Sequence, residues 1–145
     1  CQGTSEIADA LRECKLDELR MACNSIGPKG LHVLAKALLS TNSTLKSLVL
    51  DGNDVTGCKT MTNLSFRDVT GLHALFAAAT ASRLCDISLR GCHMDEDQCL
   101  GSIVRFLRPG GNAIQKLDLS QNELITDKGK SIVKSIQGPG REFIC

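Results

Sequence analysis

The sequence predicts an α/β solenoid in which short strands and helices alternate and stack along one axis. Three observations predict it. A leucine-containing phrase recurs four times in the 145 residues, and apolar residues at helical spacing follow each copy. The chain holds only 3% aromatic residues but 20 leucines, so its core has to be built from aliphatic side chains. Repeated units that cannot bury their apolar face alone stack on their neighbours and share one continuous core.

The four phrases occupy residues 16–26, 45–55, 84–94 and 114–124. In each, apolar residues stand at the first, fourth, sixth and eleventh positions, and the ninth is asparagine or, in the third phrase, Cys92. A strand alternates its two faces, so Leu48 and Leu50 are expected inside and Ser47 and Val49 outside. The phrases therefore predict short parallel strands that form the concave face.

Helices are expected after each phrase, because apolar residues recur there at i, i+3, i+4 and i+7. These stripes occupy residues 31–38, 72–79, 100–107 and 129–136, and Pro28 suits the first turn of the first helix. An earlier stripe of Ile7, Ala8, Leu11 and Cys14 predicts a helix over residues 4–14 that belongs to a preceding repeat. The helices should cover the convex side.

The phrases fit the leucine-rich-repeat signature L-x-x-L-x-L-x-x-N/C-x-L, and their starts at 16, 45, 84 and 114 lie 29, 39 and 30 residues apart. Residues 24–38 are similar to the N-x-I-G-x-x-G-x-x-x-L-A-x-A-L unit of the ribonuclease-inhibitor-like class, which includes the Ran GTPase-activating protein and the repeat regions of NOD-like receptors. The resemblance implies one horseshoe-shaped domain over residues 1–145 with about four to five repeats. We expect it to be part of a longer array.

Eight cysteines form an even set, which permits a disulfide framework. Such frameworks serve small secreted domains with weak cores, whereas here most cysteines replace an aliphatic residue of the repeat. We therefore expect free thiols and an intracellular, cytoplasmic location. Cys92, His93 and Cys99 lie close in sequence, but their spacing matches no standard zinc site, so no metal is expected.

The second repeat carries about ten extra residues, an insertion over residues 56–68 in the loop between strand and helix. Asn24 and Gly30 are six residues apart, whereas Asn53 and Gly71 are 18 apart. The insertion is either a tolerated surface excursion or a binding element at one rim. Its apolar and basic side chains are candidate partner contacts: Lys59, Met61, Phe66 and Arg67.

The outward positions of the strands supply further candidates for contact with a partner. These are Glu18, Arg20, Val49, Asp51, Asp86, Arg90, Lys116 and Asp118. Parallel stacking places Asp51 beside Arg90 and Asp86 beside Lys116, so we expect ion pairs there. The surface is polar and mixed in sign.

The function predicted is a non-enzymatic protein-interaction module or scaffold that binds a protein partner through the concave face and the insertion. A net charge of +1 and the absence of Trp and Tyr disfavour nucleic acid, and no apolar run is long enough for a membrane span. No catalytic or cofactor motif is present. Two alternatives stay open: a small-GTPase regulator resembling the Ran GTPase-activating protein, and the sensor region of a multidomain receptor.

Overall fold

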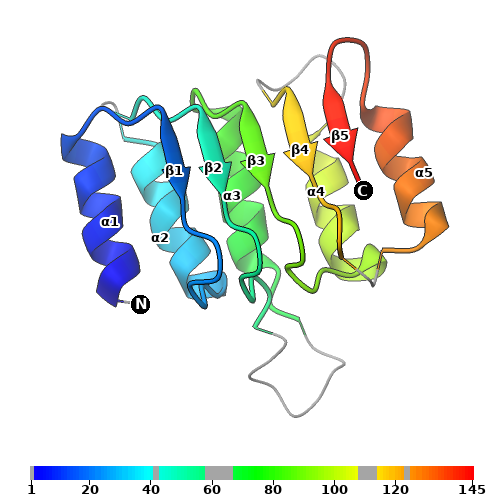
Figure 1. Ribbon diagram of the computed structural model, residues 1–145, viewed down its shortest axis with the longest axis horizontal. Helices are drawn as coiled ribbons and strands as arrows, with labels where there is room; N and C mark the ends of the chain where they lie inside the picture. Colours follow the sequence, from blue (N-terminus) through cyan, green and yellow to red (C-terminus); the bar gives the residue numbers. More distant parts are fainter. Residues whose placement is uncertain (1, 41–42, 58–66, 108–113, 123–124) are drawn as a thin grey trace.

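A computed structural model describes residues 2–40, 43–57, 67–107, 114–122 and 125–145. Five parallel strands lie side by side in sequence order and form one sheet (Figure 1). They are β1 (Glu18–Arg20), β2 (Ser47–Val49), β3 (Asp86–Ser88), β4 (Lys116–Asp118) and β5 (Glu142–Ile144). The predicted parallel sheet is therefore confirmed.

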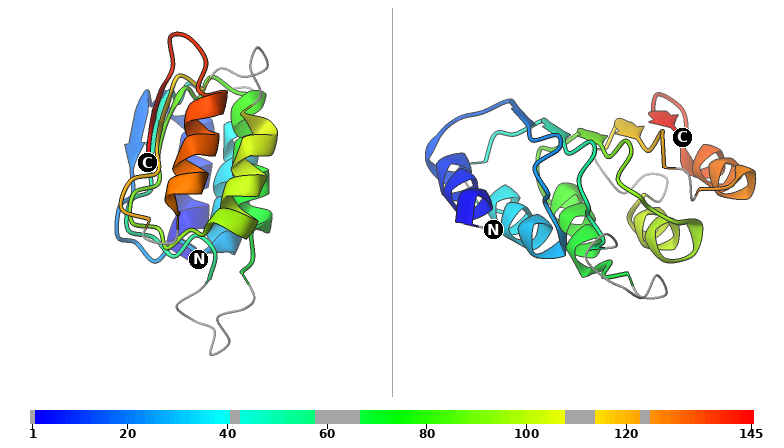
Figure 2. Two further views of the ribbon diagram at one scale, coloured as in Figure 1. Left: turned by 90° about the vertical axis from the view of Figure 1, so that its right-hand side faces the viewer. Right: turned by 60° about the horizontal axis from the view of Figure 1, so that its bottom comes forward.

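Helices cover one face of this sheet. They are α1 (Gln2–Glu13), α2 (Pro28–Leu38), α3 (Thr70–Thr80), α4 (Gly101–Phe106) and α5 (Asp127–Ile136), and a π-helical turn, η2 (Glu96–Leu100), leads into α4. Figure 2 shows the two layers edge-on, and its second view shows the helices on the outside of an arc. The α/β solenoid expected from the repeats is the architecture that the chain adopts.

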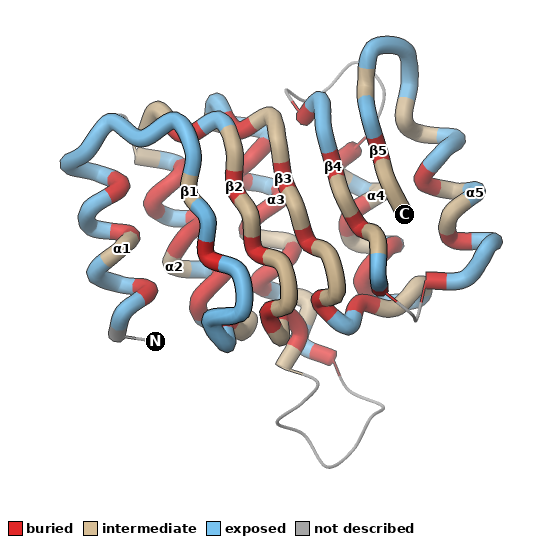
Figure 3. Tube along the Cα trace, viewed as in Figure 1, coloured by how far each residue is buried: buried red, intermediate tan, exposed pale blue. Residues whose placement is uncertain are grey.

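The strands are in register, so equivalent residues of successive repeats are neighbours. The central residues Leu19, Leu48, Ile87, Leu117 and Phe143 form the inward row. Leu48, Ile87 and Leu117 are at most 1% exposed, and they belong to one aliphatic core with the buried faces of the helices. Figure 3 shows buried and more accessible positions alternating along the inner strands. Burial of each such side chain stabilises the fold by roughly 1.5–3 kcal/mol.

Asparagine side chains join successive repeats. The Asn53 Oδ1 atom accepts hydrogen bonds from the backbone N–H groups of Asn24 and Ile26, both at 2.9 Å. Its Nδ2 atom donates to the carbonyls of Met21 and Leu50, both at 2.8 Å. Asn53 therefore satisfies buried backbone groups of two repeats at once, which is why the ninth position of the phrase is so restricted.

Cys92 replaces this asparagine in the third repeat. Its buried thiol donates to the Leu50 carbonyl at 3.3 Å, and the backbone N–H groups of Cys92 and Met94 donate in turn to Asn122 Oδ1. Burial raises the pKa of the Cys92 thiol to about 11, so it stays protonated and keeps its donor. The thiol supplies one donor where an asparagine amide supplies two.

Close helix contacts make one glycine necessary. A Cβ atom on Gly71, near the start of α3, would lie 2.5 Å from the Pro28 carbonyl oxygen and 3.0 Å from the Leu31 Cβ. Only a residue without a side chain lets α3 approach α2 this closely.

The structure corrects the sequence expectations at three places. Strand β5 forms beyond the fourth phrase, with Phe143 where the other repeats have an aliphatic residue. Cys14 is exposed rather than part of a buried stripe, and Leu16, the first residue of the first phrase, is 37% exposed. Most of the insertion, residues 58–66, lies outside the described residues.

Six cysteines fall within the described ranges, and all six are free thiols: Cys14, Cys23, Cys85, Cys92, Cys99 and Cys145. Burial raises the pKa of the Cys99 thiol to about 12. Within those same ranges, no three metal-ligating side chains converge, and no helix is long and apolar enough to cross a membrane.

Candidate functional site

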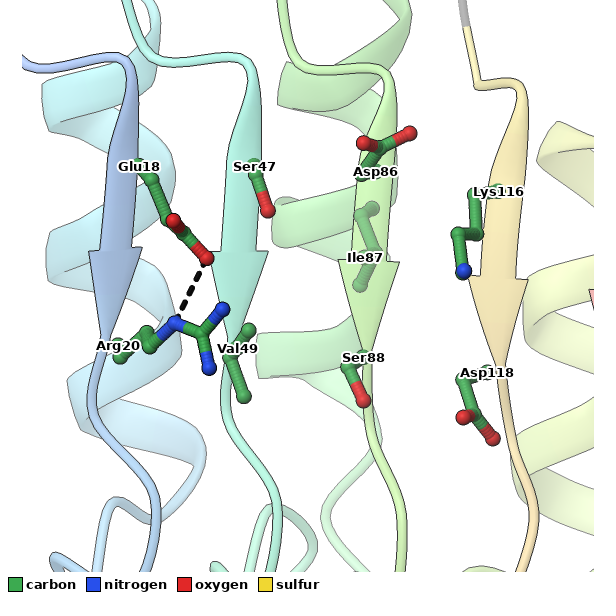
Figure 4. A pocket seen from close by; sticks show the side chains of 9 residues that line it. All are labelled: Glu18, Arg20, Ser47, Val49, Asp86, Ile87, Ser88, Lys116 and Asp118. Carbon is green, nitrogen blue, oxygen red and sulfur yellow. Dashed lines mark hydrogen bonds and ion pairs between the residues drawn. The ribbon is translucent and has the colours of Figure 1, made fainter.

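A shallow depression of about 220 Å³ lies on the concave face of the sheet (Figure 4). Six of the eight residues predicted there line it, together with two serines and one core residue. The lining residues are Glu18, Arg20, Ser47, Val49, Asp86, Ile87, Ser88, Lys116 and Asp118. Asp51 and Arg90 lie in the next row of outward positions, beyond the ends of β2 and β3.

The register of the strands brings these residues together. Glu18, Ser47, Asp86 and Lys116 occupy paired positions in one row across four strands. Two residues further along each strand, a second row contains Val49, Ser88 and Asp118. Because side chains alternate faces along a strand, both rows point away from the helices.

Several charged side chains of this face form ion pairs, but their partners differ from those that the sequence predicts. Lys116 Nζ lies 3.3 Å from Glu142 Oε2, so Lys116 pairs with β5 rather than with Asp86. The prediction failed because β5, which places Glu142 directly beside Lys116, was not expected. At the other edge of the sheet, Arg20 Nε lies 2.7 Å from Glu18 Oε1.

The expected ion pair between Asp51 and Arg90 is also replaced. Asp51 Oδ1 accepts from the Ser88 hydroxyl at 2.5 Å and from the Arg90 backbone N–H at 3.0 Å. The Arg90 guanidinium instead approaches Asp118, with 3.8 Å between Nε and Oδ2. That separation is an ion pair without a hydrogen bond, and the buried Nε atom of Arg90 has no hydrogen-bond partner.

Arg67, predicted as a partner contact, is buried and bound within the chain. Its Nε atom lies 2.5 Å from Asp95 Oδ2, and the two side chains are 7% and 21% exposed. Its Nη1 atom donates to the His93 carbonyl and, at 3.4 Å, to the Thr56 hydroxyl. Arg67 therefore joins the rim loops of two repeats. The other three candidates of the insertion, Lys59, Met61 and Phe66, lie outside the described residues.

A family model described as leucine-rich repeat matches residues 13–35, 41–57 and 113–129. These ranges contain three of the four phrases, and the unmatched phrase is the one with Cys92. No curated protein matches the chain. Among solved structures, one described as "Leiomodin-1 Actin-Binding Site 2 (ABS2)" is similar, with a TM-score of 0.67 and 13% identity over 96% of this chain and 76% of that chain. Together with the alternating strands and helices, these matches show that the chain is an α/β solenoid of leucine-rich repeats.

Proposed function

We propose that the chain is a protein-interaction module that binds its partner on the concave face of the sheet, without catalysis of its own. One observation carries the proposal. The helices cover one face of the sheet, and no described element covers the other (Figure 2). Outward residues such as Arg20, Val49 and Lys116 are half-buried or exposed there. A solenoid that buries its core between neighbouring repeats leaves such a surface free for binding.

The charges of this face favour a protein over a nucleic acid. The outward strand positions hold five carboxylates and three cations: Glu18, Asp51, Asp86, Asp118 and Glu142 against Arg20, Arg90 and Lys116. An excess of carboxylates repels phosphate, whereas nucleic-acid binding needs clustered lysine and arginine. A polar face of mixed sign suits a protein surface that carries complementary charges.

We further propose that residues 1–145 form one domain of a longer intracellular array of the ribonuclease-inhibitor-like class. The similarity to the leiomodin structure supports a protein partner, and actin is the first candidate to test because that structure is described as an actin-binding site.

Site-specific cross-linking tests the location of the interface. A photoreactive p-benzoylphenylalanine replaces Val49 on the concave face or, as the matched control, the exposed Lys36 on the convex helix α2. We expect ultraviolet light to produce protein adducts at position 49 in cell extract and with purified actin, and few at position 36. Equal adducts at both positions, or none at position 49, would refute a concave interface.

Actin itself is tested with purified monomers and the full chain, by thermophoresis. We expect saturable binding that the substitution Val49→Trp abolishes, since a bulky side chain there obstructs the depression. Saturable binding that Val49→Trp leaves unchanged would place actin elsewhere and count against the concave site.

A further inference from the structure

Asp86 stands out among the charged residues of the depression because no described cation pairs with it. Glu18 is paired with Arg20, Asp118 with Arg90, and Lys116 with Glu142. The Asp86 carboxylate has no described lysine or arginine nitrogen within ion-pair distance. It is half-buried, on the middle strand of the five. A carboxylate in this position retains its acceptor capacity for a ligand.

The immediate surroundings of Asp86 suit a long basic side chain. Ser47 is its register neighbour on β2, and Ser88 lies two residues further along β3. Figure 4 shows both serine side chains in the depression, with Val49 next to Ser88. Serine hydroxyls can accept further hydrogen bonds from an ammonium or guanidinium group, and an apolar side chain can pack against the methylene stem.

The neighbouring thiol does not alter this charge. Burial, together with the Asp86 carboxylate, raises the pKa of the Cys85 thiol, so Cys85 stays neutral. The nearest cation in the same row, Lys116, is held by Glu142 at 3.3 Å. The net excess of carboxylates on the face therefore persists at its centre, where it attracts a positive group.

We propose that the partner inserts a lysine or arginine side chain into the depression and that this side chain pairs with Asp86. The inference rests on the proposed function, because it assigns the chemistry of the partner at the same concave face. Charge-assisted hydrogen bonds to a partly buried carboxylate are stronger than neutral ones, so Asp86 would determine which protein segments bind.

The test uses a phage-displayed library of random peptides selected on the full chain, with binding measured by isothermal titration. We expect concave-face binders, recognised by their loss on Val49→Trp, to carry a common lysine or arginine. Replacement of that residue in the peptide, or Asp86→Asn in the protein, should each weaken binding by about tenfold or more, which is the size of one such contact. Asp97→Asn, which removes an exposed carboxylate from the π-helical turn, is the matched control and should leave the affinity unchanged.

The outcomes separate the two proposals. Concave-face binders without a common basic residue, or with equal affinity for Asp86→Asn, would overturn the role of Asp86 and leave the concave interface standing. Failure to select any binder that Val49→Trp disrupts would overturn both. Circular dichroism melts of the three variants confirm that a lost affinity reflects the site rather than the fold.

Discussion

The Asn53 side chain of the second repeat binds the backbone of Ile26 in the first, with 2.9 Å between Oδ1 and the amide nitrogen. Asn122 makes the equivalent bond to Met94 at 3.1 Å. The two amides lie just after β2 and β4, where the chain turns away from the sheet and its backbone groups would otherwise be buried without partners. Each connects its repeat to the one before it.

The loss of one such side chain should destabilise the fold strongly. We expect Asn53→Ala to lower the free energy of unfolding by about 3 kcal/mol, since several buried backbone groups lose their partners. Urea unfolding followed by circular dichroism measures it. Asn24→Ala is the control, because this exposed side chain makes one described bond, to the Ala22 carbonyl, and should change stability by less than about 0.5 kcal/mol. Equal losses in the two variants would contradict the assignment.

Cys92 offers the reverse experiment. Cys92→Asn should raise the free energy of unfolding by about 1 kcal/mol, because the amide supplies a second donor and a stronger acceptor than the thiol sulfur. Cys92→Ala removes the bond to the Leu50 carbonyl and should destabilise. Thermal melts of the three proteins rank them, and an asparagine variant less stable than wild type would show that the third repeat has adapted its packing to sulfur.

The ion pair between the buried Arg67 and the half-buried Asp95 should contribute more to stability than the exposed pairs of the concave face. Arg67→Ala is expected to cost about 3 kcal/mol or more, because it leaves the Asp95 carboxylate without its cation. Arg20→Ala breaks an exposed pair and should cost less than about 1 kcal/mol. Both values come from urea titrations, and a larger loss for Arg20→Ala would reverse our assignment of structural and surface roles.

Glu96 gives the fold a pH dependence. The Thr126 hydroxyl and the Gly129 backbone N–H donate to its carboxylate, and these bonds hold the pKa of Glu96 below its ordinary value of 4.5. A lowered folded-state pKa means stabilisation that is present above the ordinary value and lost as the pH falls through the folded one. The stability difference between wild type and Glu96→Gln should therefore be larger at neutral pH than in acid, as measured by urea unfolding at both. A pH-independent difference would argue against this ionised cap.

The sequence predicted the sheet and its register because the leucine spacing leaves one way to bury each strand. It missed β5 because residues 141–145 contain neither a leucine nor the following asparagine, and Phe143 takes the inward place. The repeat determines which strand position points inward, and Phe143 shows that an apolar residue other than leucine can occupy that position.

The arrangement of charges was harder to predict than the fold. A long side chain can pair with a residue other than the one directly beside it. The Arg90 guanidinium therefore pairs with Asp118, while the Asp51 carboxylate accepts a hydrogen bond from the Arg90 backbone. Arg67 and Asp95 meet only because two rim loops pack together, and no repeat position relates them. Strand periodicity shows which side chains point outward but not which partner each selects.

The bonds that join Thr56 to Arg67 and Asp68 also have a use in protein engineering. Thr56 and Arg67 flank residues 58–66 on either side, and the Asp68 backbone N–H donates to the Thr56 carbonyl at 3.1 Å, so these bonds join the two stems of the loop. We expect a foreign peptide grafted between these stems to leave the solenoid folded as long as the stem bonds are kept, which would make the second repeat a scaffold for peptide display.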